Sequence, residues 1–201
     1  MTVGIIDYGV GNIGSLQNMF FRLEVDASFV TDPAALTAYD HVVLPGVGAF
    51  DVAAAELQRT GFDDAVRAYA ATGKQLLGIC LGMQLLLDSS EEGVLSGLGL
   101  ISGTSVRFDP SMGLRVPHLG WAQIRKERDH PIVADLPDDH RFYFAHSYHV
   151  KCADESNVLA STEYGARYAS MICADSVTGA QFHPEKSHRF GMQMLKEWVQ
   201  Q

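Results

Sequence analysis

The stretch Gly78-Ile79-Cys80-Leu81-Gly82 sets one cysteine between two glycines, where an apolar strand-like run gives way to a helical pattern. Residues 74–79 end in an apolar run typical of a buried strand, and residues 83–87 resume a pattern that predicts a helix. Small flanking residues let such a strained turn close. The turn therefore aims the Cys80 sulfur out of the sheet at a helix N-terminus, where the helix dipole favours the thiolate.

A second stretch, Gln181-Phe182-His183-Pro184-Glu185, follows another strand-like run, 177–182. His183 can take the thiol proton and return it to a leaving amine, while Glu185 can accept the other ring N–H and orient the ring. Taken without the cysteine, this stretch is better interpreted as a surface loop. With Cys80, it predicts a nucleophile, its base and an orienting acid.

A third stretch, Pro45-Gly46-Val47-Gly48, ends the strand-like run 41–44. A strand that ends in Gly-x-Gly leaves backbone N–H groups facing the sheet edge. One of them, with the N–H of Leu81, would form an oxyanion hole with two donors. The alternative is a plain strand-ending turn, and the loop alone does not decide between the two.

Gly9, Gly11 and Gly14 fit the dinucleotide pattern Gly-x-Gly-x-x-Gly, and Asp32 follows at the spacing of a ribose-binding acid. Asp7 and Tyr8 interrupt the apolar run before these glycines, and no second nucleotide-binding half follows. We therefore expect no nicotinamide cofactor.

Two further histidines, His146 and His149, are three positions apart in a segment that looks extended, so their side chains would point to opposite faces. Two such imidazoles without a nearby acid do not make a zinc site, and we expect no metal. Cys152 and Cys173 lie in strand-like runs without glycine flanks and are interpreted as buried structural cysteines.

The chain has 201 residues, 47% hydrophobic and 19% charged, which favours one domain spanning 1–201. The formal net charge is −9 without any basic cluster, so we expect no nucleic-acid partner. No signal peptide and no apolar run of membrane-spanning length are evident, so we expect a cytoplasmic protein without membrane contact. Three cysteines in unrelated contexts favour a reducing compartment.

The first half alternates strand-like and helical segments, which predicts an α/β fold with a mixed, centrally parallel sheet and helices on both faces. Predicted strands are 3–6, 26–31, 41–44 and 74–79, and predicted helices are 13–23, 50–59, 62–71 and 83–87. Short strand-like runs, typical of antiparallel hairpins, fill the second half at 104–108, 116–125, 141–144, 147–151, 158–161, 167–174 and 177–182. A last helix over 189–199 is expected to be capped by Ser187.

Residues 78–84 together with His183-Pro184-Glu185 resemble the class I glutamine amidotransferases, the triad family of glutaminases. Four more stretches are similar to the glutaminase subunits of imidazole glycerol phosphate synthases, in histidine biosynthesis: 7–12, 117–121, 143–148 and 183–187. The resemblance covers essentially the whole chain and implies a flavodoxin-like α/β fold. Two departures, Ala122 and Ala145, concern the partner surface rather than the chemistry.

The resemblance implies that Cys80 attacks the carboxamide of L-glutamine, releases ammonia and forms a glutamyl thioester that water hydrolyses to glutamate. Val47 and Leu81 would supply the oxyanion hole. The residues expected to bind substrate are Gly46, Gly48, Gln84, Glu92, Ser147 and Tyr148. Ammonia would pass to a cyclase subunit in a heterodimer, and the residues expected at that interface are Asn12, Trp121, Tyr143 and Lys186.

The glycines that flank Val47 lower the cost of turning its peptide, and a glutaminase active alone would waste glutamine. We hypothesise that this oxyanion loop stays in a poor geometry until the cyclase is engaged. Three alternatives remain open: a cysteine hydrolase acting on γ-glutamyl compounds or small peptides, a catalytically silent regulatory or binding subunit, and an amidotransferase of another pathway.

Overall fold

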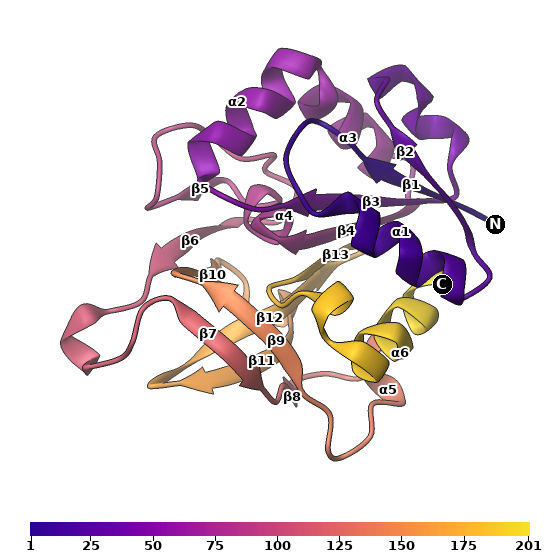
Figure 1. Ribbon diagram of the computed structural model, residues 1–201. Coiled ribbons are helices and arrows are strands. Elements are labelled where there is room, and N and C mark those ends of the chain that lie inside the picture. Colours follow the sequence, from indigo (N-terminus) through magenta and orange to yellow (C-terminus); the bar gives the residue numbers. More distant parts are fainter.

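A computed structural model of the protein describes residues 1–111 and 113–201, and within them one eleven-stranded sheet forms the centre of the molecule (Figure 1). Nine of its strands follow one another in the spatial order β2 (Asp26–Val30), β1 (Thr2–Ile6), β3 (His41–Gly46), β4 (Gln75–Cys80), β13 (Val177–Ala180), β12 (Ala166–Ala174), β10 (Tyr148–Cys152), β6 (Gly103–Arg107) and β5 (Ser89–Ser90). The remaining two, β11 (Val158–Tyr164) and β8 (Arg125–Lys126), pair with each other, and β11 also pairs with β12.

The strands from β2 to β13 pair in parallel, and the direction changes where β13 meets β12. The predicted mixed sheet with a parallel centre is therefore confirmed. β3 is buried along its whole length, because parallel strands are covered on both faces.

Helices cover both faces of this sheet (Figure 1). α2 (Phe50–Thr60) and α3 (Phe62–Ala70) pack into one hydrophobic cluster, while α1 (Ile13–Arg22) and α6 (His188–Val199) pack into the other. The short helix α5 (Pro131–Ala134) joins the second cluster. The predicted helices are confirmed, except that α4 (Leu81–Leu85) begins immediately after Cys80, two residues earlier than predicted.

The predicted strand 116–125 is wrong as one element, because it divides between two sheets. β7 (His118–Ala122) pairs antiparallel with β9 (Phe142–His146) in a separate two-stranded sheet. β8 instead joins β11 in the central sheet. The chain crosses from one sheet to the other at Gln123 and Ile124, which lie outside both strands.

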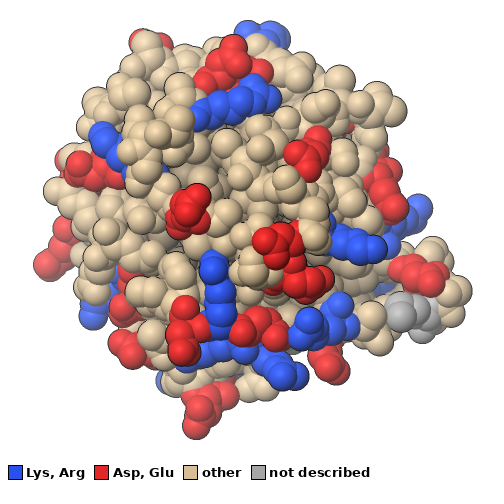
Figure 2. Space-filling view, turned by 180° about the vertical axis from the view of Figure 1, so that it is seen from behind, with Lys and Arg blue, Asp and Glu red and all other residues tan. Residues whose placement is uncertain are grey.

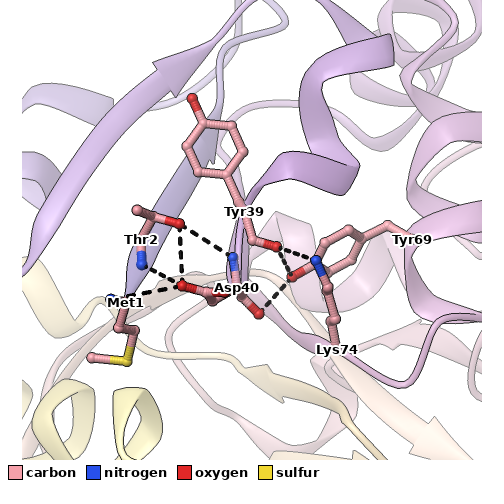
Figure 3. A network of polar contacts seen from close by, with 6 residues as sticks. All are labelled: Met1, Thr2, Tyr39, Asp40, Tyr69 and Lys74. Atoms are coloured by element: carbon pink, nitrogen blue, oxygen red, sulfur yellow. Dashed lines mark hydrogen bonds and ion pairs between the residues drawn. The ribbon is translucent and has the colours of Figure 1, made fainter.

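A polar network ties together the amino ends of the parallel strands (Figure 3). The Asp40 carboxylate accepts a hydrogen bond from the Thr2 N–H at 2.8 Å and lies 3.8 Å from the amino group of Met1. Tyr69 donates its hydroxyl to the Asp40 carbonyl at 2.9 Å, and Lys74 Nζ donates to the Tyr39 carbonyl at 3.0 Å. The network therefore holds the starts of β1, β3 and β4 together.

The surface carries charges of both signs. On the face shown in Figure 2, Lys and Arg side chains lie among Asp and Glu side chains rather than in a separate area. Among the helices of residues 1–111 and 113–201, none is long and apolar enough to cross a membrane.

The substitution Gly82→Ala tests the packing at the start of α4. A Cβ on Gly82 would lie 1.9 Å from the carbonyl oxygen of Leu44, which is backbone and cannot rotate away. We expect a loss of about 3 kcal/mol in the free energy of unfolding, as for overpacked core sites. Urea denaturation followed by circular dichroism measures it.

Gly14→Ala in α1 is the matched control, because a Cβ at Gly14 meets nothing within 4 Å. It should leave stability unchanged or raise it by about 0.5–1 kcal/mol, since alanine favours the helix. Equal unfolding midpoints for the two variants would contradict the close packing at Gly82.

Candidate active site

Cys80 ends β4 in a strained backbone conformation, with φ +54° and ψ −110°. A residue other than glycine rarely adopts a positive φ, and such strain gathers at functional sites. The turn predicted around Cys80 is confirmed. Its side chain is buried but reaches a cavity that opens at the carboxyl edge of the parallel strands.

His183 reaches the same edge because β13 pairs in parallel with β4. Its Nδ1 lies 2.8 Å from Glu185 Oε1, and both side chains are about 95% buried, with 5% and 4% exposed. Since Glu185 occupies Nδ1, the other ring nitrogen is left for the sulfur. Burial alone would lower the pKa of His183, but hydrogen bonds to Cys80 and Glu185 and their negative charges raise it to about 9. A protonated imidazole at neutral pH is the partner that a thiolate needs.

Ser187 holds the loop of His183 in place instead of capping α6. Its hydroxyl donates to the His183 carbonyl at 2.6 Å and accepts from the Tyr143 N–H at 3.0 Å. The His183 N–H in turn donates to the Tyr143 carbonyl at 2.9 Å. The predicted side-chain cap is therefore wrong, because the hydroxyl is used in fastening this loop to β9.

The cavity has a volume of about 390 Å³, within the range of small-molecule sites. Residues predicted from separate parts of the sequence share its wall: Val47, Gly48, Cys80, Leu81, Gln84, Glu92, Ser147, Tyr148, His183 and Lys186. Gly46 lies behind the wall, paired with Cys80 between β3 and β4. Its lack of a side chain makes room for α4, since a Cβ there would come within 2.8 Å of the Gly82 nitrogen.

The backbone donors of the predicted oxyanion hole come from two elements. Leu81 is the first residue of α4, where helix N–H groups have no partner within the helix. Val47 follows β3, is 41% exposed, and precedes Gly48, which has φ +96°. Glu92 borders this loop, because its Oε2 accepts a hydrogen bond from the Phe50 N–H at 3.0 Å, at the start of α2.

Gln181 is a site residue that the sequence analysis did not single out. It is fully buried, its Oε1 accepts from Gln84 Nε2 at 3.1 Å, and its Nε2 lies 4.0 Å from Cys80 Sγ. The signal in the sequence is a glutamine inside the strand-like run 177–182, two positions before His183.

Three of the four residues predicted at a partner surface lie together beside the cavity. Trp121 packs edge-on to Tyr143 with ring centroids 5.9 Å apart, and Lys186 Nζ lies 5.7 Å from the centroid of the Tyr143 ring. Trp121 is 44% exposed. Asn12 is exposed at the start of α1.

The glycines of the dinucleotide-like pattern shape the turn before α1. Gly9 and Gly11 have φ +88° and +126°. The Tyr8 hydroxyl donates to the Pro45 carbonyl at 2.9 Å, which joins this turn to the loop after β3. In the part of the chain that the structure describes, no three His, Cys, Asp or Glu side chains gather in a way that could hold a metal.

The chain belongs to the class I glutamine amidotransferase family: the family model described as Glutamine amidotransferase class-I matches residues 4–201. Two relatives bear the name imidazole glycerol phosphate synthase subunit HisH. The protein of Methanococcus maripaludis, HisH 2, is 42% identical over 99% of both chains, and that of Symbiobacterium thermophilum is 46% identical over 96% of this chain and 91% of its own.

Solved structures share the fold. A chain in the structure of PurLQS from Thermotoga maritima matches with a TM-score of 0.77 at 18% identity, over 99% of this chain and 97% of that one. A glutamine amidotransferase crystal structure matches with a TM-score of 0.76 at 20% identity, over 98% and 97%. These likenesses support the α/β architecture.

Glu185→Gln tests the charge that acts on His183. The carboxylate contributes to raising the His183 pKa to about 9, so its removal lowers that pKa while the effect of burial remains. Between neutral pH and pH 9 the ring then loses its proton, and the sulfur loses its cationic partner. We expect the midpoint of Cys80 alkylation by iodoacetamide against pH to move upward in the variant. An unchanged midpoint would contradict this coupling.

Proposed function

We propose that this protein is the glutaminase subunit of an imidazole glycerol phosphate synthase: it hydrolyses L-glutamine and passes the ammonia to a cyclase subunit in a heterodimer. The observation that carries the proposal is the cavity lined by both Cys80 and His183, with Glu185 hydrogen-bonded to His183 behind it. Membership of the amidotransferase family and the names of the relatives support the substrate and the pathway.

In the proposed first half-reaction, the Cys80 thiolate attacks the carboxamide carbon of glutamine. The N–H groups of Leu81 and Val47 stabilise the resulting oxyanion. The His183 imidazolium then gives its proton to the leaving nitrogen, ammonia departs, and a glutamyl thioester remains on Cys80. Glu185 accepts the Nδ1–H throughout and keeps the ring in one orientation.

The second half-reaction returns the enzyme to its starting state. The neutral His183 takes a proton from water, and the hydroxide attacks the thioester carbon. Cleavage of the carbon–sulfur bond releases glutamate and restores the thiolate beside imidazolium. The substrate's amino-acid end would lie against Gln84, Gly48 and the Ser147–Tyr148 segment, with the Glu92 carboxylate facing its ammonium group.

The surface beside the cavity suits a cyclase subunit as partner. Leu119 and Trp121 project from the same face of β7 and are 63% and 44% exposed. Exposed apolar side chains that gather beside a site are typical of interaction surfaces. We place the partner interface over this face of β7, with Tyr143, Lys186 and Asn12 as further contacts.

Cys80→Ala should lower the release of ammonia from glutamine by at least about a thousandfold, because the nucleophile is lost. Cys152→Ala is the matched control, since Cys152 is buried at the end of β10 and lies outside the cavity wall. A contrary result would be a wild type that releases no ammonia from glutamine but cleaves γ-glutamyl peptides, with Cys80→Ala inactive on those peptides. That result would favour a hydrolase of other γ-glutamyl compounds.

Glutamine hydrolysis should rise at least about tenfold when the cyclase subunit and its ligand are added, if the peptide of Val47 turns into place only then. Trp121→Ala should weaken this activation by removing an exposed aromatic side chain from the proposed interface. Equal rates with and without the partner would reject the hypothesis of a closed oxyanion loop.

A further inference from the structure

Five buried polar side chains form a continuous line from strand β7 to the Cys80 sulfur, separate from the His183–Glu185 pair. They come from five different elements or loops. Hydrogen bonds between side chains join them, except that His146 and Gln84 both bind the backbone carbonyl of Tyr148. In order along the line they are His118, Tyr168, His146, Gln84 and Gln181.

The carbonyl of Tyr148 fixes the direction of the two hydrogen bonds at the centre of this line. It accepts from His146 Nδ1 at 2.8 Å and from Gln84 Nε2 at 3.0 Å. A carbonyl oxygen can only accept, so both nitrogens must carry the hydrogen. The orientation of the Gln84 amide and the tautomer of His146 follow from this one atom.

On the side of the sulfur, the Gln84 amide nitrogen also donates to Gln181 Oε1 at 3.1 Å. The oxygen of Gln181 is therefore engaged, and its Nε2 is directed to Cys80 Sγ at 4.0 Å. Gln181 is fully buried. A hydrogen bond from a buried N–H group becomes stronger when the sulfur that accepts it becomes anionic.

On the side of β7, burial lowers the pKa of His146 to about 3, so the ring is neutral and its Nε2 is an acceptor. The Tyr168 hydroxyl, 3.2 Å away, must donate to it. The Tyr168 oxygen can then accept from His118 Nδ1 at 3.0 Å. Burial likewise lowers the pKa of His118 to about 4, which leaves one hydrogen on this ring.

We infer that Gln181 stabilises the thiolate of Cys80 through its amide N–H, and that His118, Tyr168 and His146 are positioning residues that hold this amide in place. The inference rests on the proposed function, since it takes Cys80 as the nucleophile. When the thiol proton passes to His183, the N–H of Gln181 already faces the sulfur that gains the charge. His118 and the exposed Leu119 and Trp121 share β7, so the line starts beneath the proposed partner surface.

Gln181→Met keeps the length of the side chain but removes the donor. We expect the midpoint of Cys80 alkylation by iodoacetamide to rise by about one pH unit, which is about a tenfold lower rate at pH 7. The alkylated peptide containing Cys80 is followed by mass spectrometry, so that Cys152 and Cys173 do not contribute. Thr178→Val is the matched control in β13, because its buried hydroxyl has no hydrogen-bond partner in the described part of the chain.

Tyr168→Phe and His118→Leu test the part of the line that is distant from Cys80. Tyr168→Phe removes only one oxygen atom, so it keeps the inference testable even where Gln181→Met does not fold. Each should slow alkylation at pH 7 about threefold and raise KM for glutamine, because the amide of Gln84 becomes less well held. His118→Asn should restore both values, since its amide nitrogen can replace Nδ1 as the donor. An effect of His118→Leu that His118→Asn does not reverse would overturn the role of the line.

The outcomes separate this inference from the proposed function. Alkylation of wild-type Cys80 at pH 7 no faster than that of a free cysteine would reject the reactive thiolate on which both depend. Fast alkylation of Cys80 in the wild type that stays equally fast in Gln181→Met overturns the inference alone. Iodoacetamide requires no glutamine turnover, so neither result depends on the substrate.

Discussion

The start of α4 and the end of β3 approach each other so closely that glycine is required on both sides. Gly46 leaves room for the backbone of Gly82, and Gly82 leaves room for the Leu44 carbonyl. Because α4 begins one residue after β4, the chain must reverse at Cys80, which takes a positive φ as a result. The direction of the sulfur and the free N–H of Leu81 both follow from this contact.

The second half of the site depends on strand register. β13 pairs with β4 from Val177↔Leu76 to Ala180↔Ile79, so the chain leaves β13 level with Cys80. The bonds of Ser187 to His183 and Tyr143 then fasten the next turn to β9. Helix α6 also packs against this turn, since a Cβ on Gly191 would lie 2.0 Å from the Pro184 carbonyl. The turn that carries His183 is thus held by contacts with β9 and α6 and by the pairing of β13 with β4.

Much of this could be predicted from the sequence, because the determining signals are local. Glycines around Cys80 and apolar runs before it define the turn, and alternating strand and helix patterns define the parallel sheet. The division of 116–125 between β7 and β8 could not be predicted, since it depends on partners far along the chain. The prediction that Ser187 caps the last helix is wrong, and the role of Gln181 could not be predicted, for the same reason: what their side chains bind is decided by residues brought near only in the fold.

Both ends of the chain lie at the edge of the sheet that is remote from the cavity. Met1 pairs with Asp40, just before β3, and Trp198, near the end of α6, packs edge-on against His41 with ring centroids 5.0 Å apart. Labels, tethers or fused proteins joined at either end would therefore project from the back of the molecule. Such attachments would leave the cavity and the proposed partner surface free. The protein can therefore be immobilised through either end while the binding of a partner is measured.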